Sequence, residues 1–314
     1  FEHLIKIINN FDKVFELDEV GEGQYRVWIG AEDLQSGNSY QVKIITPSGI
    51  EIVSDMDKMP ECPAVDSIYY SRKDLPSNIP YKPIQAIQFY LDFDGGNSDC
   101  RYYRWELTET WENRASYANT LYWTGSQIIE IKPADFSKFY CWNTKKIKDI
   151  YTLSTVNLSH NKYKMLKLHI VDDQSERLTY CYSLLIDQYA LSETAYNYWN
   201  NLRIASHRQG GLYDTQPLRI KGNLKSTTNP EIEILGFFNA SAVKSKRIFV
   251  QNVENFTVFY PDCEPRMPGI GEFNQGTPPK YLVYAEGAIK VVQSHCVECT
   301  LLGGSTIKPD FWPY

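Results

Sequence analysis

The sequence predicts a mainly β protein made of two β-sandwich domains of the immunoglobulin or transthyretin type, the larger with one inserted α-helix. Three observations lead to this fold class. Short segments alternate between apolar and polar residues with the two-residue period of half-buried strands, as Tyr40, Val42 and Ile44 do. The 314 residues include 23 Tyr, 14 Phe and 7 Trp, whose bulk favours strands and fills a sandwich core. Helical spacing of apolar residues is confined to a stretch near 193–207.

Residues 1–63 are predicted to form the end of a small N-terminal sandwich. Strands are expected at 23–29 and 39–45, next to turns that contain glycine. A segment of this length buries little surface by itself, so either earlier strands or docking onto the next domain has to complete it. The proline-flanked Cys62 marks a linker, and the domain boundary is placed near residue 63.

Residues 64–314 are predicted to form a larger antiparallel sandwich, because short strands follow one another with turn signals between them. A first strand is expected to begin within 65–70. The other strands are expected near 85–93, 101–111, 126–131, 150–155, 164–171, 178–189, 231–240, 246–251, 256–260 and 280–293.

One α-helix is expected to interrupt this series of strands. Ser192 stands at its N-cap position, where a hydroxyl oxygen can accept an otherwise unpaired N–H of the first turn. The apolar stripe that the helix would bury consists of Ala195, Tyr198, Trp199 and Leu202. Gly210 and Gly211 would end it, since glycine adopts the left-handed C′ conformation without a Cβ clash.

The residues around this helix carry a resemblance to a known family. They comprise Gln188-Tyr189-Ala190, the helix with Tyr198 and Trp199, the loop 210–217, Gly222-Asn223, the segment 236–241 and the segment 246–249. The segments 102–105, 141–142 and 296–312 fit the same pattern. In combination these motifs resemble DUF4249, a domain of unknown function of Bacteroidetes surface lipoproteins. The resemblance names a family to which no chemistry is assigned.

The resemblance implies a non-catalytic, surface-exposed lipoprotein that serves as an accessory subunit of a TonB-dependent transporter or a similar barrel complex. Such a subunit would capture or gate a ligand, or brace the barrel. Its partner would be an outer-membrane β-barrel protein, and it would lie on the cell-surface side of the outer membrane. The sequence begins at Phe1 without Met or a signal peptide, so a lipid anchor is expected to precede Phe1. The alternatives are a structural subunit of an outer-membrane secretion or assembly machine, and an undetected hydrolase.

Charge and motif content exclude several function classes. The 32 Lys and Arg residues against 38 Asp and Glu form no basic stripe, so nucleic acid is not an expected partner. No apolar run approaches the roughly 20 residues of a membrane helix. Nucleophile-elbow, zinc-protease and phosphate-loop motifs do not occur, so we expect neither an enzyme nor a cofactor. Glu109 and Glu112 would suit glycoside hydrolysis, but any acidic β protein offers such pairs.

Four of the seven cysteines are candidates for disulfide bonds. Cys263, Cys296 and Cys299 cluster near the C-terminus, and Cys141 falls in the expected β core. The exported location that the resemblance implies favours disulfides over the zinc site that a CysXXCys pair could form. The spacing does not decide which cysteines pair, and an odd total leaves at least one thiol without a partner in the chain.

Two further groups of polar residues are candidate sites. Asp92, Asp94, Asn97 and Asp99 could offer oxygen ligands to calcium, but their spacing is not that of an EF-hand. We therefore expect no bound metal and favour a polar hairpin loop. Ser67 follows Asp66 in an Asp-Ser-aliphatic triplet, which resembles the O-glycosylation signal of exported proteins of the same bacteria.

Two long polar loops, 209–217 and 265–279, are the expected contact surfaces for the partner. Tyr213 and Phe273 are the candidate anchors of this interface. Aromatic side chains next to glycine can supply the buried centre of a protein–protein contact.

Overall fold

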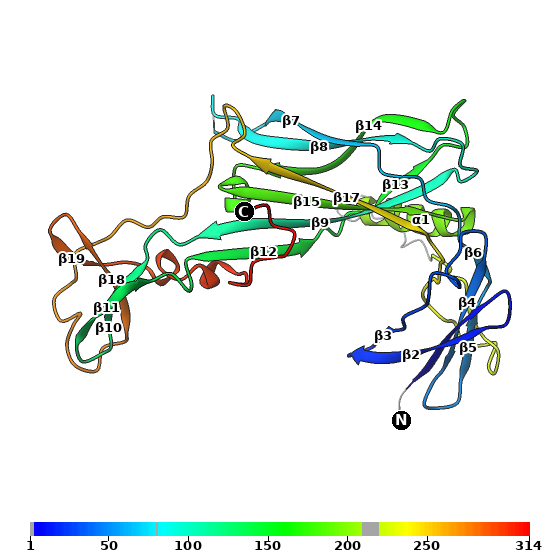
Figure 1. Cartoon of the computed structure of the whole chain (residues 1–314), viewed down its shortest axis with the longest axis horizontal. Coiled ribbons are helices and arrows are strands. Elements are labelled where there is room, and N and C mark those ends of the chain that lie inside the picture. Colours follow the sequence, from blue (N-terminus) through cyan, green and yellow to red (C-terminus); the bar gives the residue numbers. More distant parts are fainter. Residues whose placement is uncertain (1–2, 80, 209–219) are drawn as a thin grey trace.

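The computed structural model describes residues 3–79, 81–208 and 220–314, and these residues form an arch of three β bodies (Figure 1). A central sandwich is the top of the arch, and two further sheets form its legs. The described residues contain one α-helix and several antiparallel sheets, so the predicted mainly β class is confirmed. No helix among them is long and apolar enough to cross a membrane.

The central sandwich consists of a three-stranded and a five-stranded antiparallel sheet. The three-stranded sheet has the order β14-β8-β7, and the five-stranded sheet has the order β12-β9-β15-β17, with β13 also pairing with β9. Their bounds are β7 Ser67–Leu75, β8 Ile84–Asp94, β14 Lys162–Asp172, β9 Tyr102–Arg114, β12 Tyr140–Lys146, β13 Tyr151–Ser154, β15 Cys181–Ala190 and β17 Val243–Gln251. A short 3-10 helix, η1, at Glu176–Leu178 precedes β15.

The main hydrophobic core lies between these two sheets. Successive inward positions of β8 are Ile87, Phe89, Leu91 and Phe93, and each is completely buried. They meet inward residues of β9 and β15, such as the Tyr182 ring that stacks on Phe89. Each such side chain stabilises the fold by about 1.5–3 kcal/mol, which makes the sandwich the stable centre of the molecule.

The N-terminal leg is a single sheet made of the strands between residues 4 and 58 and one strand from far along the chain. Its order is β16-β5-β4-β1-β2-β3, with β6 also pairing with β4. The bounds are β1 Leu4–Asn9, β2 Val14–Gly21, β3 Gln24–Arg26, β4 Ser39–Ile45, β5 Glu51–Ser54, β6 Asp57–Lys58 and β16 Leu224–Ser226. Phe238 and Ala240 pack against Tyr40 and Met59 of this leg, so docking onto the rest of the chain helps to complete it.

The other leg is a four-stranded sheet with the order β11-β10-β18-β19. The sequence predicts these residues to be part of the larger sandwich. Its bounds are β10 Asn119–Trp123, β11 Ile128–Asp135, β18 Lys280–Ala285 and β19 Ala288–Val291, followed by the 3-10 helices η2 Ser294–Cys296 and η3 Cys299–Leu302. It has cores of its own, one around Trp123 and Leu282 and one around Val283 and Val297. Residues 64–314 thus form both the central sandwich and this small sheet. Alternation of apolar and polar residues predicts where a strand lies, but it does not predict which sheet that strand joins.

Several predicted strands differ from the structure. The segments 231–240 and 256–260 form no strand, whereas β10 and β12 form where the sequence predicts none. The segment 280–293 is a hairpin, β18–β19, that turns at Glu286 and Gly287 with φ of 54° and 76°. Turn residues with positive φ break a run that is apolar enough to pass for one strand.

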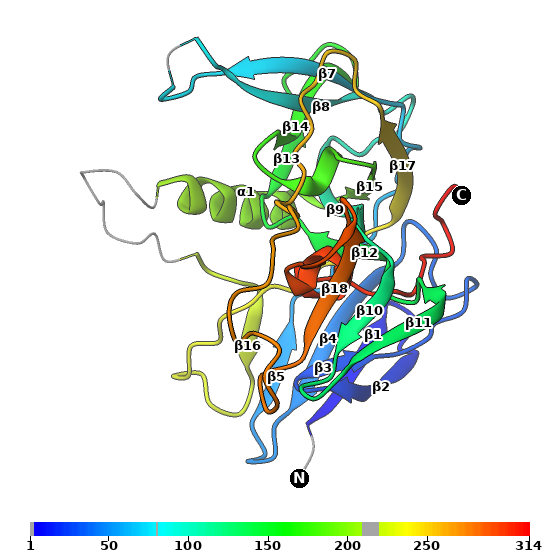
Figure 2. The same ribbon diagram turned by 90° about the vertical axis from the view of Figure 1, so that its left-hand side faces the viewer.

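The α-helix α1, Glu193–Arg208, confirms the predicted helix and its cap. The Ala195 amide donates to the Ser192 hydroxyl at 3.2 Å. Ala195 is fully buried, whereas Tyr198, Trp199 and Leu202 are half-buried, so the helix covers one side of the sandwich without entering it. Figure 2 shows the helix and the C-terminal tail on opposite sides of the molecule. The expected end of the helix at Gly210 and Gly211 lies outside the described residues.

Candidate functional site

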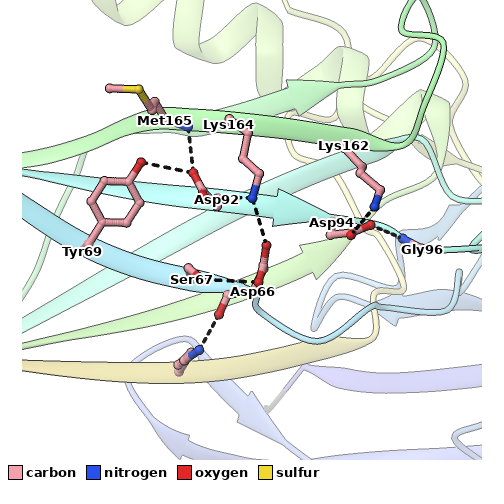
Figure 3. A network of polar contacts seen from close by, with 10 residues as sticks. Asp66, Ser67, Tyr69, Asp92, Asp94, Gly96, Lys162, Lys164 and Met165 are labelled. Carbon is pink, nitrogen blue, oxygen red and sulfur yellow. Dashed lines mark hydrogen bonds and ion pairs between the residues drawn. The ribbon is translucent and has the colours of Figure 1, made fainter.

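The candidate glycosylation serine, Ser67, lies at the start of β7 on the outer face of the central sandwich (Figure 3). Its side chain is exposed and its hydroxyl donates to Asp66 Oδ1 at 3.3 Å. Lys164 Nζ stands 3.6 Å from Asp66 Oδ2, and the Lys246 ammonium donates to the Asp66 carbonyl. These contacts fix the start of β7 and leave the serine accessible.

The acidic residues considered for calcium are engaged by lysines. Asp92 accepts bonds from the Met165 amide at 2.9 Å, from Lys164 Nζ at 3.0 Å and from the Tyr69 hydroxyl at 3.1 Å (Figure 3). The Met165 bond, together with the charge of Lys164, lowers the pKa of Asp92 below its usual value. A calcium ion at Asp92 would have to displace that lysine.

Asp94 has an equivalent arrangement beside the same loop. Lys162 Nζ lies 2.7 Å from its carboxylate, and the Gly96 amide donates to it at 2.9 Å. The bond from Lys162 is the main reason that the pKa of Asp94 is lowered. Asn97 and Asp99 are exposed in the turn that follows. These four polar residues lie at the end of β8 and in the loop that leads from β8 to β9. The two strands belong to different sheets, so this loop is not the hairpin that the sequence favours.

The clustered cysteines form two disulfide bonds, Cys141–Cys299 and Cys263–Cys296, so the predicted presence of disulfides is confirmed. Within the described residues, one group of three potential metal ligands has its atoms within 4.8 Å of one another: Cys263, His295 and Cys296. Two of these three are joined as a disulfide, which has no thiolate to offer zinc. The cluster is therefore a covalent link between the segment before the loop 265–279 and η2.

The remaining cysteines, Cys62, Cys100 and Cys181, are buried thiols. Burial raises the pKa of each of them above that of a free thiol. A buried thiol with a raised pKa carries little reactive thiolate at neutral pH.

The candidate catalytic pair does not assemble. Glu109 and Glu112 are three residues apart in β9, so their side chains leave opposite faces of the strand. Glu109 points into the sandwich, where its Oε2 accepts the Tyr182 hydroxyl at 3.0 Å. Arg177 Nη1 lies 3.3 Å and His169 Nε2 3.5 Å from the same oxygen. Two carboxylates on opposite faces cannot flank one glycosidic bond.

Glu112 anchors the C-terminal tail on the outer face of the five-stranded sheet. Its carboxylate accepts hydrogen bonds from Trp312 Nε1 at 3.2 Å and from the Tyr314 hydroxyl at 3.1 Å. It also forms an ion pair with Arg114. The Phe311 ring next to it lies under the Arg247 guanidinium, 3.5 Å from the ring centre. The tail motif therefore has a structural role in covering this face.

Most motif residues around the helix meet at the junction between the sandwich and the N-terminal leg. The side chain of the buried Gln188 accepts a hydrogen bond from Trp105 Nε1 at 3.0 Å. It donates a second one to the carbonyl of Pro63 in the linker at 2.8 Å. The Arg104 guanidinium lies between two rings, 4.0 Å from the Trp199 ring centre and 4.8 Å from that of Tyr189. These contacts tie the end of β15 to the linker and α1 to β9.

The two glycine motifs of the junction pack directly against each other. A Cβ on Gly222 would lie 1.6 Å from the Gly236 carbonyl oxygen, so only glycine fits. The neighbouring Asn223 side chain accepts the Phe238 amide at 2.8 Å and donates to the Phe238 carbonyl at 2.7 Å. Two residues further, the Ala240 amide donates to Asp57 of β6 at 2.8 Å. The segment 222–240 is thereby fixed to the N-terminal leg, and its Phe237 ring also stacks on Tyr198 of α1.

Replacing Trp199 by alanine is expected to destabilise the protein by roughly 3 kcal/mol, the low end for Trp→Ala, because the ring is half-buried. The variant loses the stack on Arg104 and the hydrogen bond to Asn239 Oδ1 at 3.3 Å. Asn201→Ala, at an exposed position of the same helix, is the control. Thermal unfolding measures both, and an unchanged melting temperature for Trp199→Ala would show that the helix is peripheral.

A cavity of about 600 Å³ opens at the same junction. The linker 58–61, the loop 98–102 and the residues Leu191–Glu193 at the start of α1 line it. This volume suits a small molecule. Its wall mixes Lys58 and Arg101 with Glu61 and Asp99, so the cavity wall does not specify the charge of a ligand.

The loop 265–279 is folded back onto the small sheet. Phe273 packs against Trp123 with ring centres 5.3 Å apart, so the predicted interface anchor is an internal contact that holds the loop. Glu272 accepts two bonds from Arg266, at 2.8 and 2.6 Å, and one from the Gly269 amide at 2.7 Å. The Arg266 bonds contribute most to lowering the pKa of Glu272 far below its usual value. The other predicted anchor, Tyr213, lies outside the described residues.

The same loop presents two apolar side chains that the sequence analysis did not single out. Ile270 is fully exposed at its tip, and Met267 is 61% exposed. Both belong to the run Met267-Pro268-Gly269-Ile270-Gly271, in which apolar residues alternate with turn formers that cannot bury them. This sequence pattern could have identified the two exposed side chains, because it favours a rigid apolar tip over a flexible polar loop.

Comparison with known proteins gives one match. The family model described as "Domain of unknown function (DUF4249)" matches residues 4–247. This range covers the N-terminal leg, the helix and the junction, and it ends before the loop 265–279. No curated protein and no solved structure shows detectable similarity to the chain.

Proposed function

The chain belongs to the DUF4249 family, whose function is unknown, and on this premise we propose that it is a non-catalytic accessory protein of an outer-membrane β-barrel complex. It is held on the cell-surface side of the outer membrane by a lipid anchor. It binds a TonB-dependent transporter or similar barrel through the tip of the loop 265–279. There it braces the barrel or helps to capture and gate its ligand.

The preorganised tip of the loop is the observation that carries this proposal. Arg266 and Glu272 close the loop, and Phe273 pins it to the small sheet. Met267 and Ile270 therefore project in a fixed conformation. Rigid apolar side chains of this kind lose little conformational entropy on binding, which suits the buried centre of an interface.

The engagement of the acidic clusters supports a binding role over the hydrolase alternative. Glu109 is committed to Tyr182 and Arg177 inside the sandwich, and Glu112 holds the C-terminal tail. Asp92 is paired with Lys164. Catalytic acids need access to a substrate and a partner on the same face, and these carboxylates serve packing instead.

Replacing both Met267 and Ile270 by serine is expected to weaken association with the barrel at least tenfold, since two central contacts of an interface commonly exceed about 1.4 kcal/mol. The melting temperature should stay close to that of the wild type, because both side chains are exposed. The measurement is co-elution of barrel protein after gentle detergent extraction from the native membrane.

Leu235→Ser is the matched control, because Leu235 is also largely exposed but lies on the segment near the N-terminal leg. The proposal predicts that this variant retains the barrel. If the wild-type protein elutes alone at monomer size with no barrel enriched, the accessory role is wrong. If Leu235→Ser loses the barrel and the loop variant keeps it, the loop is the wrong surface.

A further inference from the structure

The cavity at the junction between the central sandwich and the N-terminal leg has no part in the proposed accessory function. Figure 1 shows β6 of the leg and the helix α1 at the same end of the sandwich, and residues from β6 and from the start of α1 line the cavity. Its volume of about 600 Å³ lies within the range of small-molecule sites. Such sites occur preferentially where two bodies of a protein meet, so this cavity is a candidate binding site.

Hydrogen bonds within each body hold the walls of the cavity in place. On the side of the N-terminal leg, the Gly37 amide donates to the Met59 carbonyl at 2.8 Å. In the loop between β8 and β9, the Arg101 carbonyl accepts a hydrogen bond from the Thr155 amide at 2.9 Å. The Ser192 cap fixes the start of α1. A ligand therefore meets walls that are already formed, which reduces the conformational entropy lost on binding.

The apolar wall of the cavity consists of four side chains: Met59, Cys100, Leu191 and Tyr102. The first three are almost completely buried, at 7%, 9% and 1% exposed. The Tyr102 ring adds aromatic surface and packs on Tyr196 of α1, with ring centres 5.1 Å apart. An apolar group of a ligand that contacts this wall is removed from water, which favours its binding.

The charged rim of the cavity carries both signs. It consists of two cationic and three anionic side chains: Lys58, Arg101, Glu61, Asp99 and Glu193. Arg101 is half-buried, and the other four residues are exposed. Within the part of the chain that the structure describes, no ion pair joins any of the five to another charged side chain. Opposite charges that share a cavity without pairing can each bind a charged group of a ligand.

The charged rim and the apolar wall together suit a ligand that has an ammonium group, a carboxylate and an apolar side chain. An anion alone would be repelled by the three carboxylates of the rim, and a cation alone by Lys58 and Arg101. We propose that the cavity binds an apolar amino acid or a short apolar peptide with free ends. The cations of the rim bind its carboxylate, the carboxylates of the rim bind its ammonium group, and the apolar wall contacts its side chain. This site does not depend on the proposed accessory function.

Titration calorimetry of the purified protein with leucyl-leucine tests the ligand class. Acetylating the amino end or amidating the carboxyl end removes one charge, so each blocked dipeptide should bind roughly tenfold more weakly. Glycyl-glycine should also bind more weakly, because it has no side chain for the apolar wall. Free leucine distinguishes the two sources of this chemistry: equal affinity for leucine indicates an amino-acid site, and higher affinity for the dipeptide indicates a peptide site.

Two substitutions test the charged rim. Arg101→Gln should lose most of the preference for leucyl-leucine over its amide, and Asp99→Asn should lose most of the preference over the acetylated dipeptide. Each variant should keep the other preference, which a general disturbance of the cavity would not allow. Lys73→Gln, at an exposed position of β7 outside the cavity, is the control and should bind like the wild type.

Three results would overturn the proposal: no saturable binding of leucine or leucyl-leucine at millimolar concentrations, equal affinities for the free and the blocked dipeptides, or an Arg101→Gln variant that keeps its full preference for the free carboxylate. None of these titrations requires a barrel partner. A failed titration would leave the accessory function standing, and a protein that elutes without a barrel would leave the ligand site standing.

Discussion

Replacing Glu109 by alanine is expected to destabilise the protein by roughly 3–5 kcal/mol, the range for breaking a buried ion pair from one side. Glu109 is 3% exposed and faces the core between the two sheets. Without its carboxylate, the Tyr182 hydroxyl loses its acceptor and the Arg177 guanidinium loses its nearest counter-charge. Asp172, at 3.8 Å from Arg177, is too far away to replace it.

The effect of this substitution should depend on pH. Burial by itself raises the pKa of Glu109, but His169, Arg177 and Tyr182 more than offset it, so the pKa in the folded protein is lowered. A carboxylate whose pKa is lowered by folding contributes its full stabilisation above the pKa of the unfolded chain, about 4.3. This contribution is lost as the pH falls through the pKa of the folded protein. The difference in unfolding free energy between wild type and Glu109→Ala should therefore shrink below about pH 4.

Chemical denaturation at several pH values measures both effects. Glu16→Ala is the control, because Glu16 pairs with Lys6 at the surface of the N-terminal leg and is 66% exposed. An exposed pair contributes at most about 1 kcal/mol. A Glu109→Ala variant as stable as Glu16→Ala would show that the buried carboxylate is dispensable for the sandwich.

Removing the Cys141–Cys299 disulfide is expected to cost about 2–5 kcal/mol, and more than removing Cys263–Cys296. The first bond closes 158 residues and the second closes 33, and a longer closed loop restricts the unfolded chain more. The first also fixes η3 to β12, which holds the small sheet at the end of the sandwich. The paired alanine variants should therefore unfold at lower temperature than the wild type.

Intact-mass analysis and calorimetry check this prediction together. Under denaturing conditions without reductant, three of the seven cysteines should be alkylated: Cys62, Cys100 and Cys181. Cys181→Ala is the control for the loss of a buried sulfur without the loss of a bond. Seven alkylated cysteines without reductant would contradict both disulfides, and an unchanged melting temperature would contradict their contribution to stability.

The sequence by itself determined the features that depend on a few neighbouring residues. The strand at 39–45 follows from the alternation that starts at Tyr40, and its observed bounds are the predicted ones. The helix at 193–208 follows from its Ser192 cap and its apolar stripe. Backbone geometry sets the two-residue period of a strand and the 3.6-residue period of a helix, and a few neighbouring residues are enough to show either period. The opposite faces of Glu109 and Glu112 could have been read in the same way.

Only the tertiary structure decided which distant segments meet. β16 joins the N-terminal leg through the pair Lys225 and Val53, which local alternation does not signal. The same holds for the partner of each disulfide cysteine and for Phe273, which turned inward onto Trp123 and left Ile270 exposed. Each of these contacts closes a long loop of the chain, and closing a loop costs entropy that the neighbouring residues do not offset. The contacts therefore depend on the burial and hydrogen bonding of the whole fold.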